Sequence, residues 1–205
     1  RKGWTTTRVY AAEQDITGGA LVLRVVVGRI EGYRYNDKDA DDRLTYAFPE
    51  EAGGYLNLRD LEQGLENLNR VPSQEAKFQL YPGKEPGTSV VVVEMTEKPR
   101  NRWTQMVDNS GNTSMGHWRS NTEFATDNLW GRNDQLAIGY NRNLDRGTLG
   151  SLFEGVTANY SLSRGNHLWG ASLAVFKTDF TLPGINQDYL YQTRSKKSGV
   201  SYEYL

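Results

Sequence analysis

Residues 57–95 read NLRDLEQGLENLNRVPSQEAKFQLYPGKEPGTSVVVVEM, and this stretch decides the fold of the chain. Its first part has leucines at helical spacing, which predict a helix with one apolar stripe formed by Leu58, Leu61, Leu65 and Leu68. Asn57 is the expected N-cap, and Asp60 lies in the first turn, where a carboxylate suits the helix dipole. Val71 precedes Pro72, which disfavours the helical conformation and ends the helix.

The second part of the stretch predicts a hairpin. Apolar residues at 76, 78 and 80 alternate with residues 77, 79 and 81, as in a half-buried strand over 75–81. Two Pro-Gly dipeptides mark the turn. The β-branched run Val90–Val93 predicts a second strand covered on both faces or nearly so. A helix packed on such a hairpin is a small α+β unit.

The composition excludes several classes of protein. Among 205 residues, 24 Lys and Arg balance 25 Asp and Glu, so no basic excess indicates a nucleic-acid partner. The chain contains no cysteine, which rules out disulfides and thiolate metal sites. No apolar run reaches the length of a membrane helix, although alternating barrel strands give a much weaker signal.

From Arg102 onward the chain alternates with a period of two residues. This pattern predicts six strands, at 103–108, 115–126, 135–141, 156–162, 169–175 and 200–204. Leu136, Ile138 and Tyr140 define an apolar face, and the opposite face is small or polar. A soluble sandwich and a membrane barrel both fit this alternation. Short predicted turns at 127–133 and 163–166, against a long loop at 178–197, favour the barrel.

The chain resembles a known family in several long segments. LNLRDLEQGLENLNRVPSQEAKFQLYPGKEPGTSVVVV (56–93) looks like the second POTRA domain of two-partner secretion transporters of the haemolysin-activator type. The likeness continues in GWTTTRVYAAEQDI (3–16), GALVLRVVVGRIE (19–31) and DNSGNTSMG (108–116). It covers most of the chain and is looser after about residue 144.

The resemblance implies a fold class and a domain order. Residues 1–28 would close a first POTRA domain, and residues 29–98 would form a second POTRA domain with βααββ order. Residues 99–205 would be the first antiparallel strands of a transmembrane β-barrel. Family members have about sixteen strands, so six strands make an incomplete barrel.

The resemblance also implies a function. The protein would be an outer-membrane pore, with its POTRA domains in the periplasm, that recognises and translocates a large secreted partner protein. An extended client segment would add to an exposed sheet edge. In the family fold that edge is the strand formed by Glu75, Ala76, Lys77, Phe78, Gln79, Leu80 and Tyr81. The alternative is a sheet edge without a binding role, which Lys77 and Pro82 protect from pairing with another strand.

Two further sets of residues are candidates for the pore. His117, Arg119, Asn121 and Glu123 would line it and keep it polar. Asp108, Asn109 and Gly111 resemble a family signature at the first barrel strand, and a plain Asn/Asp/Gly turn explains them equally well.

No enzyme, cofactor, metal or small-molecule substrate is expected, and outer-membrane lipid is the other expected partner. His117 and His167 lack ligand spacing. Asp37, Asp39 and Asp41 begin like a calcium loop, but the pattern fails where that loop needs glycine and glutamate. Two other functions remain open at this point: a barrel-assembly factor of the related superfamily, and a soluble periplasmic binding module.

Overall fold

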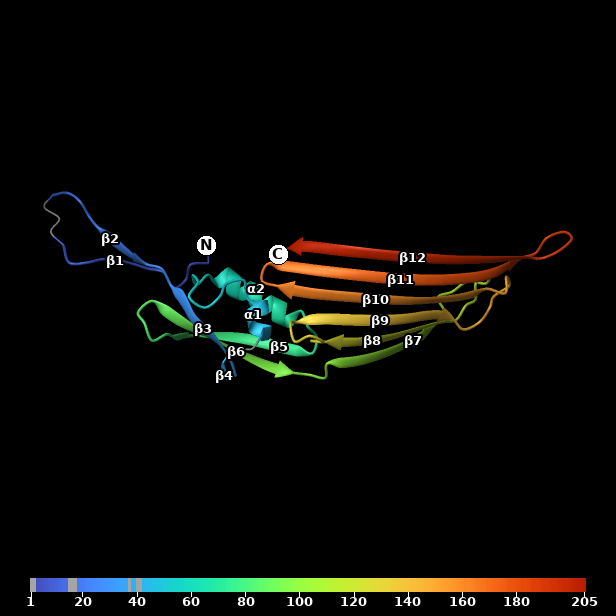
Figure 1. Ribbon diagram of the computed structural model, residues 1–205, viewed down its shortest axis with the longest axis horizontal. Coiled ribbons are helices and arrows are strands. Elements are labelled where there is room, and N and C mark those ends of the chain that lie inside the picture. Colours follow the sequence, from blue (N-terminus) through green and yellow to red (C-terminus); the bar gives the residue numbers. More distant parts are fainter. Residues whose placement is uncertain (1–2, 15–17, 37, 40–41) are drawn as a thin grey trace.

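The computed structural model describes residues 3–14, 18–36, 38–39 and 42–205, and shows an elongated molecule (Figure 1). One end is a two-stranded hairpin of β1 (Arg8–Ala11) and β2 (Leu23–Val26). A small α/β unit lies in the middle, and a six-stranded antiparallel sheet forms the other end. Asp37 and Asp41 of the calcium comparison lie outside the described residues.

The middle unit has the predicted order of elements. It contains β3 (Arg29–Tyr35), the short β4 (Lys38–Asp39), α1 (Asp42–Ala47), α2 (Leu58–Asn69), β5 (Gln74–Pro82) and β6 (Thr88–Glu97). The sheet order is β4-β3-β6-β5, in which β3 and β6 are parallel and β5 is antiparallel to β6. The extra strand β4 is the one element that the sequence pattern did not predict.

Helix α2 begins as predicted but buries a different stripe. The Asn57 carbonyl oxygen Oδ1 accepts a hydrogen bond from the Arg59 amide at 3.0 Å, which confirms the N-cap. Leu61 and Leu68 are fully buried, whereas the predicted core residues Leu58 and Leu65 are only half-buried.

The buried face of α2 contains Gly64 and Asn67 instead. A Cβ atom on Gly64 would lie 2.1 Å from the Phe48 ring, so the glycine lets this ring pack against the helix. Together with Ile30, Leu44, Leu56, Val91 and Val93, the two buried leucines form the core between the helices and the sheet.

The second sheet consists of β7 (Asn101–Asp108), β8 (Arg119–Asp127), β9 (Asp134–Asn143), β10 (Leu152–Arg164), β11 (His167–Leu182) and β12 (Tyr189–Tyr204). Each strand pairs with the next in sequence, and the sheet is open between β7 and β12. The six predicted strands are confirmed, and several differ in extent. The long loop predicted at 178–197 is wrong, because β11 runs to Leu182 and the connection to β12 consists of residues 183–188. Residues 115–118 belong to the β7–β8 connection, and β12 begins at Tyr189 rather than at residue 200.

The strand register separates two chemically different faces. One cross-strand row joins Trp103, Phe124, Ile138, Ala158 and Leu173. The adjacent row on the other face joins Thr104, Glu123, Gly139, Thr157 and Ala174. The sheet therefore has an apolar face and a small, polar face, as the alternation predicted. No helix among the described residues has the length and apolarity needed to cross a membrane.

Candidate functional site

Strand β5 lies at the open edge of the middle sheet. Among the described residues it pairs with β6 on one side, and its other side faces away from the sheet. Lys77, Gln79 and Tyr81 are exposed, while Ala76 is buried and Phe78 and Leu80 pack partly against the core. The edge position predicted for residues 75–81 is thus confirmed, and client binding there stays a prediction.

A side chain from α2 covers part of this edge. The Ala76 amide donates to Asn69 Oδ1 at 2.6 Å, and Asn69 Nδ2 donates to the Ala76 carbonyl at 3.1 Å. Main-chain groups alternate between the two sides of an antiparallel strand. Ala76, Phe78 and Leu80 therefore direct theirs outward, and Asn69 already occupies those of Ala76. The open part of the edge consists of Phe78 and Leu80.

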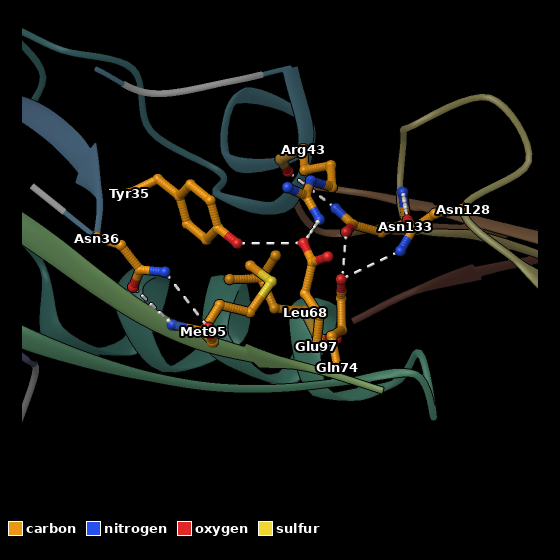
Figure 2. Close-up of polar contacts among 9 residues, drawn as sticks. All are labelled: Tyr35, Asn36, Arg43, Leu68, Gln74, Met95, Glu97, Asn128 and Asn133. Atoms are coloured by element: carbon orange, nitrogen blue, oxygen red, sulfur yellow. Dashed lines mark hydrogen bonds and ion pairs between the residues drawn. The ribbon is translucent and has the colours of Figure 1, made fainter. Parts of the chain in front are cut away.

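The beginning of β5 is attached to the six-stranded sheet through a buried amide cluster. Gln74 Nε2 donates to Asn133 Oδ1 at 3.0 Å, and Asn128 Nδ2 donates to Gln74 Oε1 at 3.1 Å (Figure 2). Asn133 Nδ2 also donates to the Arg43 carbonyl at 2.8 Å. Asn128 and Asn133 belong to the β8–β9 turn, so this turn is bonded to both α1 and β5.

A buried carboxylate ties the same two units together. The Asp127 side chain is fully buried, accepts from the Ser73 amide at 2.9 Å and forms an ion pair with Arg102 of β7. Arg102 Nη2 donates to Asp127 Oδ1 at 3.0 Å in the second arm of the pair. One side chain therefore joins β7, β8 and the loop before β5.

The β10–β11 turn makes a second attachment, to the helices. The Gly165 amide donates to the Tyr46 carbonyl at 2.9 Å, and Asn67 Nδ2 donates to the carbonyls of Gly165 and Ala47, both at 2.7 Å. Arg132 and Arg164 also lie over the Tyr46 ring, 5.0 and 5.1 Å from its centre. These contacts explain why an asparagine occupies the buried face of α2.

We call the contacts of Asn67, Gln74, Asp127, Asn128 and Asn133 the junction. None of these five residues was predicted from the sequence as a functional candidate. Two signals were present: a polar residue within an apolar stripe at 67, and asparagines in a turn at 128 and 133. Both turn asparagines have positive φ, 53° and 59°, a conformation that asparagine adopts more readily than most residues.

Figure 2 also shows a group of polar contacts that stabilises the end of β6 beside the junction. Arg43 Nη1 lies 2.6 Å from Glu97 Oε1, and the Tyr35 hydroxyl donates to the same oxygen at 3.1 Å. The hydrogen bond from Arg43 lowers the pKa of Glu97, so this carboxylate is ionised at neutral pH. The Arg43–Glu97 ion pair holds β6 to α1. The main-chain carbonyl of Arg43 is also the group that accepts the hydrogen bond from Asn133.

Removing the Asp127 carboxylate should loosen the junction. Asp127→Ala leaves the buried Ser73 amide without its acceptor, a loss of about 1–3 kcal/mol. We expect the Ser73 amide of the full-length protein to exchange with deuterium about 5- to 150-fold faster, with the amides of β6 unchanged. Asp188→Ala, an exposed loop carboxylate, is the control. Unchanged exchange at Ser73 would show that Asp127 does not hold the units together.

Three of the four pore candidates share one face of β8. Arg119, Asn121 and Glu123 pair with Asn143, Asn141 and Gly139 on the polar face, opposite Phe124. The prediction that His117 lies in a strand is wrong. Gly116, with φ of 101°, reverses the chain before it, and His117 lies in the β7–β8 connection.

Asp145 holds this connection in place. It accepts from the His117 amide at 2.8 Å and the Trp118 amide at 2.7 Å, and these bonds lower the pKa of Asp145. The backbone bonds of His117 therefore hold it at the end of the six-stranded sheet that is remote from the middle unit. Its side chain is exposed.

Asp108, Asn109 and Gly111 form the turn that leaves β7. Asp108 Oδ1 accepts from the Ser110 amide at 2.9 Å, and the Gly111 amide donates to the His117 carbonyl at 3.0 Å. A Cβ atom on Gly111 would lie 2.0 Å from the Gly116 carbonyl oxygen, so close backbone approach requires glycine there. The three residues thus lie in a turn, and their role at the pore stays a prediction.

The fold and the junction define a class of protein: a POTRA domain attached to the inner turns of antiparallel barrel strands. Residues 29–82 match the POTRA domain family, and residues 87–205 match the family described as haemolysin secretion/activation protein ShlB/FhaC/HecB. The second match covers more than half of the chain, and the chain belongs to that family. The predicted fold class is confirmed, and the sheet does not close within the described residues.

Individual relatives agree with the family match. The outer membrane transporter CdiB-2 of Burkholderia pseudomallei is 36% identical over 92% of this chain and 32% of the relative. The outer membrane transporter CdiB of Dickeya dadantii is 42% identical over 67% of this chain and 25% of the relative. The solved structure of CdiB from Escherichia coli has a TM-score of 0.85 and 27% identity, over 98% of this chain and 38% of that one. The chain thus spans a quarter to a third of these two curated relatives.

Proposed function

We propose that the full-length protein is an outer-membrane pore that recognises one large secreted partner protein in the periplasm and translocates it. The observation that carries the proposal is the open edge at Phe78 and Leu80, on a strand whose first residue is bonded to an inner turn of the barrel strands. Family membership supports the same conclusion.

The geometry indicates how capture and passage are connected. An extended client segment would pair with the outward main-chain groups of Phe78 and Leu80, which give affinity without a fixed side-chain sequence. Because the junction attaches Gln74 to the β8–β9 turn, the captured strand lies next to the inner end of the barrel. Arg119, Asn121 and Glu123 would then present a hydrated, charged wall to the moving chain.

The rival functions have less support. The family match is to secretion and activation proteins, and the named relatives are outer membrane transporters, which favours secretion over a barrel-assembly factor or a soluble binding module. The division at residues 29 and 99 stays a prediction, supported by the three separate sheets. The absence of catalysis also stays a prediction. The client could be a cytolysin, an adhesin or a contact-dependent toxin.

Co-expression with a candidate client tests the proposal. The full-length gene is expressed with its neighbouring large secreted-protein gene, and the client is assayed in the medium and the periplasm. Release into the medium that needs the full-length protein supports secretion. Retention in the periplasm contradicts it, and loss of unrelated barrels on depletion would instead indicate an assembly factor.

Placement in a membrane predicts opposite responses on the two faces of β9. Ile138→Arg should cost about 2–4 kcal/mol of unfolding free energy in vesicles if residue 138 lies near the bilayer midplane, because the guanidinium would enter lipid. Ala137→Arg, on the polar face, is the matched control and should cost much less. Spin labels at 138 and 137 should respond to oxygen and to a water-soluble relaxer, respectively. The reverse pattern would overturn the lipid assignment.

A further inference from the structure

The apolar face of the six-stranded sheet ends in a row of charges. The register places Arg142 beside Glu154, Glu154 beside Lys177, and Lys177 beside Arg194, on four neighbouring strands. Lys196 lies on the same face, one row closer to the middle of the sheet, where it pairs with Val175. We call the four cations Arg142, Lys177, Arg194 and Lys196 the outer basic patch.

The position of the patch matches one surface of a membrane. The strand ends remote from the POTRA domain are those where β11 leads into β12 (Figure 1), and Lys177 and Arg194 lie toward these ends of the two strands. Lys177 lies ten positions along β11 from His167, which belongs to an aromatic cluster at the inner end with Trp169, Tyr202 and Tyr204. Ten residues span about 34 Å along a strand, or about 26 Å across the membrane at a tilt of about 40°. This is the height of the apolar band of a membrane barrel, about 25 Å.

On β9, β10 and β11 the side chains between these two limits are apolar on the face that we assign to lipid, and they include Leu136, Ile138, Val156 and Leu173. On the same face β12 contributes Val200 and Ser198 before Lys196. The patch therefore lies just beyond the hydrocarbon, at the level of the headgroups of the outer leaflet. Cations at this depth face lipid headgroups rather than open water.

The patch has more positive charge than its neighbours neutralise. Lys177 contacts Asp179 at 2.8 Å, whereas Arg142, Arg194 and Lys196 form no ion pair within the part of the chain that the structure describes. A hollow of about 250 Å³ lies at one end of the patch, lined by Tyr140, Arg142, Leu152, Glu154 and Arg146 among others. Asp145 and Glu154 line the hollow together with Arg142 and Arg146, so its charges balance, and the excess of positive charge in the patch comes from Arg194 and Lys196. Guanidinium and ammonium groups form strong charge-assisted hydrogen bonds with phosphate.

We propose that the outer basic patch binds the phosphate groups of lipid A, the phosphorylated glycolipid of the outer leaflet. The inference rests on the proposed function, because it requires an outer-membrane barrel with the POTRA domain on the periplasmic side. Bound lipid A would fix the height and tilt of β9 to β12 in the membrane. Anionic phospholipids of the inner leaflet would lie at the opposite end of the strands.

Neighbouring lysines on opposite faces provide a matched pair of variants. Lys196 belongs to the patch, and Lys197 pairs with Ala174 on the polar face. Dissociation constants are measured for the purified full-length protein in neutral detergent with bisphosphorylated lipid A. The comparison lipids are a phosphate-free diglucosamine lipid with the same acyl chains, and phosphatidylglycerol.

The expected result is selective binding of bisphosphorylated lipid A that depends on the patch. Arg194→Gln with Lys196→Gln should weaken this binding about 30-fold, since each cation near a lipid surface contributes about 1 kcal/mol. Lys196→Gln alone should weaken it about 5-fold, and Lys197→Gln should leave it unchanged. Thermal unfolding without lipid checks that each variant is folded. If the double variant does not fold, Lys196→Gln alone is compared with Lys197→Gln.

Three outcomes would overturn the inference. These are equal affinity for the phosphate-free lipid, equal affinity for phosphatidylglycerol, or an equal loss of affinity in Lys197→Gln. Client release by the unmodified protein is measured separately. Normal release with no lipid A selectivity refutes the patch alone, whereas lipid A selectivity without release refutes the proposed function alone.

Discussion

Leu80→Pro is expected to weaken client capture by at least about tenfold, while Leu80→Ala retains most of the affinity. The Leu80 amide points to the open side of β5, as the Ala76 contacts with Asn69 establish. Proline removes this donor and places its ring in the path of the incoming strand. The lost bond contributes about 1 kcal/mol and the obstruction adds to it.

The alanine variant is the matched control for folding. Both substitutions remove the partly buried leucine side chain, and proline is compatible with an edge strand when its nitrogen faces outward. Lys77→Pro is unsuitable, because the Lys77 amide points toward β6 and its loss would break the sheet. Affinity is measured between the full-length protein and the client's N-terminal domain.

Equal client affinity in the folded proline and alanine variants would refute strand addition at β5. The exposed face of α2 around Arg59, Glu62 and Glu66 would then be the next candidate surface. Asn69→Ala gives an independent check in the opposite direction. Freeing the Ala76 main chain should lengthen the open edge and strengthen client binding.

Leu61→Ala is expected to remove about 2–5 kcal/mol from the stability of residues 29–98, expressed as a separate segment. Leu61 is fully buried against the sheet, and alanine would leave a cavity that the packed core cannot fill. A small domain has a total stability of about 5–15 kcal/mol, so the loss is a large share of it.

Urea unfolding of the segment measures this loss. Glu62→Ala, at the exposed neighbouring position, should change stability by less than about 0.5 kcal/mol. Leu65→Ala should cost less than Leu61→Ala, because Leu65 is half-buried. A segment without a cooperative transition would contradict the domain boundary at Arg29.

Short-range features of this protein are readable in its sequence, because they depend on neighbours in the chain. Asn57 caps α2 through an amide two residues away. The alternation in residues 134–143 and 152–164 sorts side chains onto two faces whatever the strands pair with. Family resemblance added the edge position of residues 75–81, and the sheet order confirmed it.

Long-range features were decided by tertiary structure alone. Asn67 bonds to Gly165 across 98 positions, and Asp127 to Ser73 across 54, so no local pattern indicates either contact. Buried polar groups need partners, and the partners come from turns that only the folded chain brings to the helices. Asn69 closes the edge at Ala76 because α2 packs beside β5, although seven positions separate the two residues. The sequence therefore determined the elements and their faces, whereas packing decided where the edge stays open and how the two units are joined.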